Sequence, residues 1–210
     1  DNSMSGFDKI DEPLVSIIVI TYNSAKYVLE TLESAKAQTY KNIELIVSDD
    51  CSKDNTVKIC NNWISENKRK FVRAELIKFG KNTGISANCN RGLNSVSGDW
   101  IKLIAGDDQL LPNCILQNIT WINNNPGIKL LFSEIEVVSN EFKLDQFKTD
   151  ITGALRFFNL PAKKQFEKLI VKNRVMAPSS FIEKDTIRKL GGFDERIKNL
   201  EDYPFWIKAT

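Results

Sequence analysis

Carboxylates that stand in adjacent pairs are the residues of this sequence best suited to chemistry. Asp49-Asp50 follows the apolar run 43–48, and Asp107-Asp108 follows the run 100–104 after two small residues. Neighbouring carboxylates repel each other unless a cation or several hydroxyl donors lie between them. Acids just past a buried strand lie at the carboxyl edge of a sheet, where open α/β folds bind their ligands. The two pairs therefore predict one site, although a solvated loop remains the alternative for each.

The chain of 210 residues contains no histidine. This absence excludes histidine general bases, Ser-His-Asp triads and imidazole metal ligands. Acid–base or metal chemistry must then come from carboxylates, which favours a hard Mg²⁺ or Mn²⁺ ion over zinc.

The overall charge is close to neutral. Lys and Arg number 29 against 27 for Asp and Glu, so the balance gives no reason to expect nucleic acid or a membrane surface as a partner. The short basic cluster Lys68–Lys70 is interpreted as a solvated helix end. The four cysteines show no CxxC spacing and predict reduced thiols in a cytoplasmic protein. No apolar run approaches the roughly 18 residues that span a bilayer.

Apolar runs alternate with amphipathic segments, which predicts an α/β fold. Such alternation implies right-handed βαβ units and a mostly parallel sheet. Asn23-Ser24 is expected to cap the first helix, and a further helix is expected from residue 201. The expected strands are 14–20, 43–47, 73–79, 100–104 and 129–138, with an edge strand at 177–182.

The turn after the first strand excludes several nucleotide folds. It contains no glycine, so it lacks the G-x-G-x-x-G of dinucleotide-binding domains, and the chain has no G-x-x-x-x-G-K-[ST] run. A phospho-receiver would need an acid pair there. Instead Tyr22 ends the first strand and Asp50 the second, so a flat base could stack on Tyr22 while Asp50 accepts hydrogen bonds from ribose or base edges.

These residues carry a resemblance to family 2 glycosyltransferases of the GT-A fold, over residues 13 to 206. The stretches that match in order are 13–23, 48–56, 82–84, 90–92, 98–108, 191–194 and 201–202. Three positions depart from the usual family pattern: Cys51 replaces a glycine, Cys89 an arginine and Ala105 an acid. The polar residues at 1–12 are expected to form a tail, and the resemblance implies a single GT-A catalytic domain at 13–210. Within it, 13–125 would be the nucleotide-sugar-binding half and 126–210 the acceptor and catalytic half.

The resemblance also implies roles for individual residues. Asp108, with Asp107, would hold a divalent cation, Mn²⁺ or Mg²⁺, against the diphosphate. Asp202 would be the general base, and Glu201 would orient it or contact the acceptor, although Asp202 could also be only a helix cap. The nucleotide-binding set implied is Thr21, Tyr22, Asn23, Asp50, Asn82 and Asp107.

The activity implied is inverting transfer of a hexosyl or N-acetylhexosaminyl group from a nucleotide sugar, with UDP expected, to a glycan or lipid-linked acceptor. Similarity to bacterial enzymes of surface-polysaccharide synthesis implies a cytoplasmic location, with peripheral contact to the inner face of the membrane. A second hypothesis is a non-catalytic nucleotide-binding or assembly module that keeps the fold. A sugar nucleotidyltransferase would require a glycine- and arginine-rich phosphate-binding loop after the first strand, and the sequence has none there.

Overall fold

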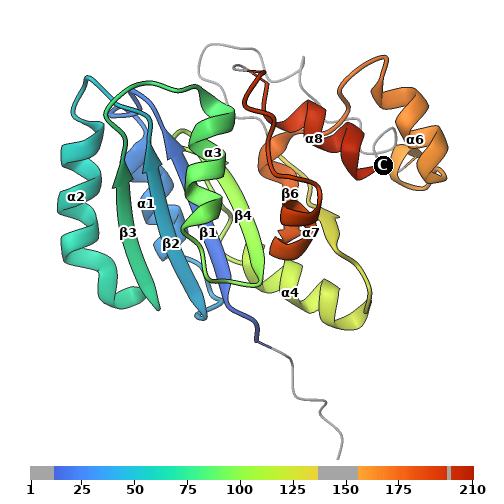
Figure 1. The fold of residues 1–210 in the computed structure, drawn as a ribbon. Coiled ribbons are helices and arrows are strands. Elements are labelled where there is room, and N and C mark those ends of the chain that lie inside the picture. The colour runs from blue at the N-terminus through green and yellow to red at the C-terminus, as the bar shows by residue number, and fades with distance from the viewer. Residues whose placement is uncertain (1–11, 137–155, 198–199) are drawn as a thin grey trace, which may run out of the picture.

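The structure is a computed structural model that describes residues 12–136, 156–197 and 200–210. One sheet of six strands has the order β3-β2-β1-β4-β6-β5 (Figure 1). β1 to β4 are parallel, and β6 is antiparallel to both β4 and β5. The α/β class and the mostly parallel sheet are confirmed. The strands are β1 Val15–Thr21, β2 Ile43–Asp49, β3 Arg73–Lys78, β4 Trp100–Ala105, β5 Leu130–Phe132 and β6 Ser180–Glu183.

Strand register brings three strand ends to one edge. β1 pairs with β2 from Val15↔Ile43 to Thr21↔Asp49, and with β4 up to Ile20↔Ala105. The segments that follow β1, β2 and β4 therefore start side by side, as the positions of the acid pairs predict.

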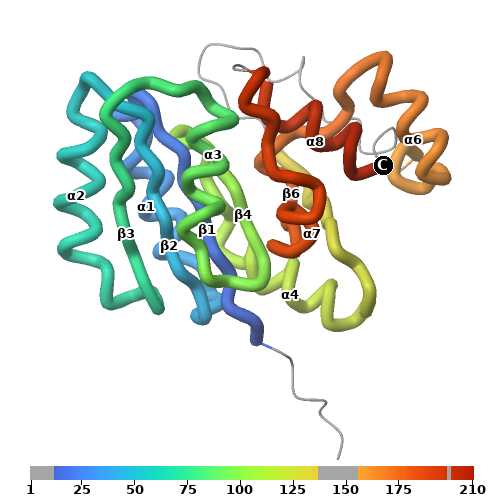
Figure 2. The backbone as a smooth tube through the Cα atoms, in the orientation of Figure 1, coloured from blue at the N-terminus to red at the C-terminus, as the bar shows by residue number. Residues whose placement is uncertain are grey.

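Helices cover both faces of the sheet. The helices are α1 Val28–Lys36, α2 Thr56–Asn67, α3 Ile85–Asn94, α4 Cys114–Asn124, α6 Ala162–Leu169, α7 Lys184–Lys189 and α8 Asp202–Ala209, with 3-10 turns η1 Lys68–Lys70 and η3 Ala177–Ser179. Buried residues of α1, α2 and α4 share one core with alternate β1 residues, whereas α3, α6, α7 and α8 share the core on the other face. Burial on both faces explains why β1 is apolar almost throughout. Figure 2 shows the chain from α6 to α8 lying to one side of the first four strands.

Three sequence expectations about elements are wrong. The fifth strand, expected at 129–138, is only the short β5 within the described residues, and 133–136 are not part of a strand. The expected edge strand at 177–182 is β6, which begins at Ser180 and lies inside the sheet between β4 and β5. Asn23-Ser24 does not cap α1, which begins at Val28 after a turn in which the Ser24 carbonyl accepts from the Tyr27 and Val28 amides. Asn23 instead adopts a positive φ of 54° and bonds the loop after β2.

No helix in the described ranges is long and apolar enough to cross a membrane.

Candidate active site

The loops after β1 and β4 pack directly on each other. The Gly106 amide donates to the Ile20 carbonyl at 2.9 Å. A Cβ on Gly106 would lie only 2.9 Å from the Ser24 Cβ and 3.0 Å from the Thr21 Cγ2. Glycine is therefore required here by close approach, and it places the Asp107-Asp108 turn beside the loop that carries Tyr22.

Three predicted nucleotide-binding residues lie on the first loop. Tyr22 is 48% exposed at the end of β1, so its ring is available for stacking. Thr21 is buried and its hydroxyl donates to Asp49 Oδ2 at 2.9 Å. The Asn23 amide donates to Ser52 Oγ, and Asn23 Oδ1 accepts from the Lys53 amide, both at 2.8 Å. Thr21 and Asn23 thus join the first two loops, and their contact with a nucleotide stays a prediction.

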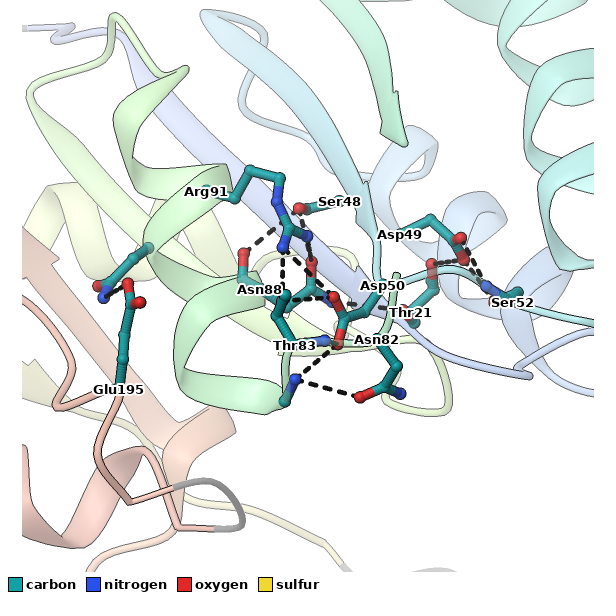
Figure 3. Close-up of polar contacts among 12 residues, drawn as sticks. Thr21, Ser48, Asp49, Asp50, Ser52, Asn82, Thr83, Asn88, Arg91 and Glu195 are labelled. Atoms are coloured by element: carbon teal, nitrogen blue, oxygen red, sulfur yellow. Dashed lines mark hydrogen bonds and ion pairs between the residues drawn. The ribbon is translucent and has the colours of Figure 1, made fainter. Parts of the chain in front are cut away.

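Asp50 is buried and fully engaged by protein donors (Figure 3). Its Oδ2 accepts from the Thr83 and Gly84 amides, each at 2.8 Å, and its Oδ1 accepts from the Thr83 hydroxyl at 2.7 Å. Arg91 Nη2 lies 3.3 Å from the same Oδ1. These four donors use the lone-pair positions of a carboxylate. The nucleoside contact expected of Asp50 stays a prediction, and it would require a ligand group to share or replace one of these donors.

Arg91 is a central residue whose role was not predicted from the sequence. Its guanidinium also donates to Asn88 Oδ1 at 3.0 Å and to the Thr83 hydroxyl at 2.7 Å, and it lies 4.2 Å from the centre of the Phe79 ring. Asn88 and Arg91 are three residues apart in α3 and so share a helix face. The stretch 90–92 was part of the resemblance, but only the helix register reveals that Arg91 faces Asp50.

Asn82 lies on the loop that Asp50 holds. It is exposed, and its Oδ1 accepts from the Gly84 amide at 3.2 Å. Its amide nitrogen has no partner among the described residues and so is available for a ligand, as a nucleotide-binding role would need.

The second acid pair differs sharply between its two members. Asp107 is exposed, and its carboxylate makes no hydrogen bond or ion pair within the described chain. Asp108 is half-buried, and its Oδ2 accepts from the Ala105 amide at 2.9 Å. Burial raises the pKa of Asp108 above its usual value; the Ala105 hydrogen bond opposes this shift and the neighbouring Asp107 adds to it. One oxygen of Asp108 and both of Asp107 are left for a ligand.

A buried lysine lies in the strand before this pair. Lys102 is 1% exposed and donates to the Pro178 carbonyl at 2.7 Å, which ties η3 to β4. Burial lowers the pKa of Lys102. The sequence does not indicate this contact, because it shows only that a lysine lies within an apolar run.

The third acid pair begins the last helix. Asp202 is buried, and its Oδ2 accepts from Asn173 Nδ2 at 3.3 Å. No side-chain cap hydrogen bond is made by Glu201, the residue just before α8. Burial, with a contribution from Asp202, raises the pKa of Glu201. Both acids line one small cavity with Trp206 and the apolar face of the sheet.

The third acid pair has no direct polar contact with the second. Among the described residues, no hydrogen bond or ion pair joins Glu201 or Asp202 to Asp107 or Asp108. The structure brings Tyr22 and Asp107 onto touching loops and leaves the proximity of Asp202 to them a prediction. Nor do the described residues contain a group of three or more His, Cys, Asp or Glu that could hold a metal ion.

A second unpredicted contact ties α3 to the segment before Glu201. Asn90 Nδ2 donates to the Phe193 carbonyl at 2.9 Å and to Glu195 Oε1 at 2.8 Å, and its Oδ1 accepts from the Phe193 amide at 2.9 Å. Gly192, with a φ of +66°, passes so close that a Cβ would lie 2.8 Å from Asn90 Oδ1. The Gly191-Gly-Phe-Asp194 stretch therefore serves as a docking loop for α3.

Comparison with known proteins identifies the family and the fold. Residues 16–181 match the family described as glycosyl transferase family 2. The chain is 30% identical over 208 residues to "Uncharacterized glycosyltransferase MJ1057" of Methanocaldococcus jannaschii, which covers 96% of this chain and 66% of that protein. The chain thus spans less than two thirds of that relative's length.

Two solved structures share the architecture. S. aureus TarS 1-349 in complex with UDP-GlcNAc superposes with a TM-score of 0.72 at 21% identity, covering 93% of this chain and 52% of TarS 1-349. The mannosyltransferase PcManGT from Pyrobaculum calidifontis, in complex with GDP-Man and Mn²⁺, gives 0.70 at 19% identity, covering 93% and 51%. The expected GT-A fold is confirmed.

Proposed function

The chain belongs to glycosyl transferase family 2, and we propose that it transfers a sugar from a nucleoside-diphosphate sugar to an acceptor hydroxyl with inversion. The observation that carries the proposal is the contact between the loops after β1 and β4. It sets an exposed aromatic ring, Tyr22, beside the exposed Asp107 and the half-buried Asp108 at the carboxyl edge of a parallel sheet. This edge is where α/β folds bind nucleotides.

The donor is proposed to be a UDP-sugar carrying a hexose or N-acetylhexosamine. The base would stack on Tyr22, and Asn82 and Asp107 would offer polar groups to the ribose. A structural neighbour that holds UDP-GlcNAc and another that holds GDP-Man support a nucleotide-sugar donor. The hydrogen bonds of Asp50 would support the nucleotide site indirectly, because they fix the loop that carries Asn82 and Thr83.

The carboxylates of the second pair fit a divalent cation. Asp107 has no protein partner among the described residues, and Asp108 keeps one free oxygen. One or two protein carboxylates suffice for Mg²⁺ or Mn²⁺, because phosphate oxygens and water complete the shell. When bound, such an ion neutralises the charge that develops on the departing diphosphate. The Mn²⁺ present in PcManGT supports a divalent metal.

Proton transfer is assigned to the third pair. Asp202 would take the proton of the acceptor hydroxyl as that oxygen attacks the anomeric carbon, and Asn173 would hold its carboxylate in place. The raised pKa of Glu201 favours its protonated form relative to an ordinary glutamate. A neutral Glu201 would place no second negative charge beside the proposed base.

We place the acceptor among glycans and lipid-linked glycans of bacterial surface-polysaccharide synthesis, with the reaction in the cytoplasm or at the inner face of the membrane. The resemblance to family 2 enzymes of that type supports this assignment. The residue division proposed is a donor half at 13–125 and an acceptor half at 126–210.

The test combines nucleotide binding with turnover. UDP with Mn²⁺ should raise the melting temperature of the chain, and Asp108→Asn should remove the metal-dependent part of the shift. Asp202→Asn should bind UDP as before but no longer hydrolyse or transfer a nucleotide sugar. Asp185→Asn, which changes an exposed aspartate on α7, is the matched control and should behave as the unaltered chain.

Two results would count against the proposal. Absence of a shift with any nucleoside diphosphate would refute the donor site. Binding of UDP with no turnover of any sugar in a nucleotide-sugar panel would favour the non-catalytic nucleotide-binding module.

A further inference from the structure

A second cavity lies at the opposite edge of the sheet from the acid pairs. It has a volume of about 250 Å³, enough for several water molecules at roughly 30 Å³ each. Ile43, the first residue of β2, forms part of its wall, whereas Asp49 ends the same strand. Six residue steps along a strand span roughly 20 Å. This cavity is therefore remote from the site described above.

Four cations from three segments line this cavity. Lys36 comes from the end of α1, Lys41 from the turn before β2, and Arg69 and Lys70 from η1. The rest of the wall is uncharged and consists of Ala35, Gln38, Tyr40, Ile43 and Phe71. No carboxylate is part of the lining. Phe71 packs against Trp63 and so fixes the end of η1 that carries the two basic side chains.

The cations differ in how far the protein already satisfies them. Lys36 pairs with Glu33 at 2.6 Å, and Lys41 donates to the Gln38 carbonyl at 2.9 Å. In the described part of the chain, Arg69 and Lys70 make no hydrogen bond or ion pair. Among the described residues, therefore, only Lys36 of the four has a carboxylate partner, and Arg69 and Lys70 have no side-chain partner at all.

A simpler role for η1 does not account for the cavity. Basic residues at the end of α2 complement the helix dipole and need no ligand for this. That role explains Arg69 and Lys70 alone, because Lys36 and Lys41 belong to other segments. Cations from three segments that converge on a hollow of about 250 Å³ are typical of an anion-binding site and not of a solvated helix end.

We propose that this basic pocket, defined as Lys36, Lys41, Arg69 and Lys70, binds the phosphate group of a ligand. The guanidinium fork of Arg69 suits two phosphate oxygens at once, and lysines act as point charges beside it. The apolar wall of Tyr40, Ile43 and Phe71 accommodates the uncharged part next to the phosphate. The ligand is either a free phosphorylated molecule or the headgroup of an anionic lipid.

The experiment separates these two sources. Pyrophosphate is titrated into the chain by calorimetry in EDTA, so that no metal can recruit it to Asp107 and Asp108. Co-sedimentation is measured with phosphatidylcholine vesicles with and without phosphatidylglycerol. Each assay compares the unaltered chain with the double variant Arg69→Ser/Lys70→Ser. The matched control, Arg188→Ser/Lys189→Ser, removes the same two charges from exposed positions on α7.

The pocket variant should weaken binding by about tenfold or more, the loss expected for one or two charge-assisted hydrogen bonds, and the control should not. Loss of pyrophosphate binding would identify a free phosphorylated ligand, and loss of phosphatidylglycerol binding alone would identify a lipid. Asp108→Asn should keep the binding in either case. The proposal is overturned if neither probe binds, or if the two double variants bind equally.

Discussion

Replacing Arg91 by methionine should destabilise the fold by about 3 kcal/mol, the lower end of the range for breaking a buried ion pair. Asp50 and Arg91 have side chains that are 3% and 16% exposed. Methionine keeps most of the side-chain volume but leaves the Asp50 charge without a counter-charge. The three donors of Thr83 and Gly84 that remain keep the loss from reaching the upper end.

The size of this stability loss depends on the burial of the ion pair and not on the distance between its atoms. The ion pair between Arg196 and Asp194 is shorter, 2.7 Å against 3.3 Å, but the Arg196 side chain is 90% exposed. Solvent screens such a pair, so Arg196→Met should leave stability unchanged within error. Arg91→Lys should recover part of the loss, since it keeps the charge but not the fork that reaches Thr83 and Asn88.

Urea unfolding at pH 7 measures the effect, with melting temperature as a second reading. A loss of about 3 kcal/mol corresponds to a fall of roughly 6–12 °C for a domain of this size. A double-mutant cycle with Asp50→Asn should give a coupling of about 1.5 kcal/mol or more. A loss below about 1 kcal/mol, or additive single mutants, would refute the view that Arg91 balances Asp50.

Two further predictions concern the loop after β4. Gly106→Ala should destabilise the fold by about 1–3 kcal/mol, because the added Cβ clashes with Ser24. It should also weaken the metal-dependent rise in melting temperature with UDP. Thermal melting measures both effects, and an unchanged melting temperature would contradict the close packing. Asp108→Asn should stabilise the ligand-free chain at neutral pH, because the pKa of Asp108 is raised in the fold. The folded state then keeps the proton to higher pH than the unfolded state, so this carboxyl adds stability at low pH and the contribution is lost as pH rises through the folded-state pKa. Urea midpoints between pH 4 and 7 should fall less steeply in Asp108→Asn than in the unaltered chain, and parallel curves would contradict the shift.

The sheet and the position of its acids could be predicted because they depend on local pattern. Strands buried on both faces read as unbroken apolar runs, and β1 and β2 are of this kind. Once such strands are parallel, the residues after them meet at one edge. Asp107 and Asp108 accordingly lie where the sequence places them, beside the loop that carries Tyr22.

The misplaced elements depend on contacts between distant residues. Ser24 is a typical helix cap residue, but α1 begins four residues after it. The Asn23 amide instead donates to Ser52, which ties this segment to the loop after β2. β6 was predicted to be an edge strand because no local sequence pattern indicates that β5, some fifty residues earlier, pairs with its outer side. The partners of Asp50 were invisible for the same reason, since Arg91 lies 41 positions away.

Neighbouring residues of α3 connect the two halves of the proposed site. Arg91 faces Asp50 and the loop that carries Thr83, whereas Asn90 holds the backbone of Phe193 and the side chain of Glu195. Residues one apart on a helix point about 100° away from each other, so one helix can serve both sides. The docking loop precedes Glu201 and Asp202 in the sequence. We therefore expect α3 to influence the position of the proposed base relative to the nucleotide, and a change that tilts this helix should disturb donor binding and proton transfer together.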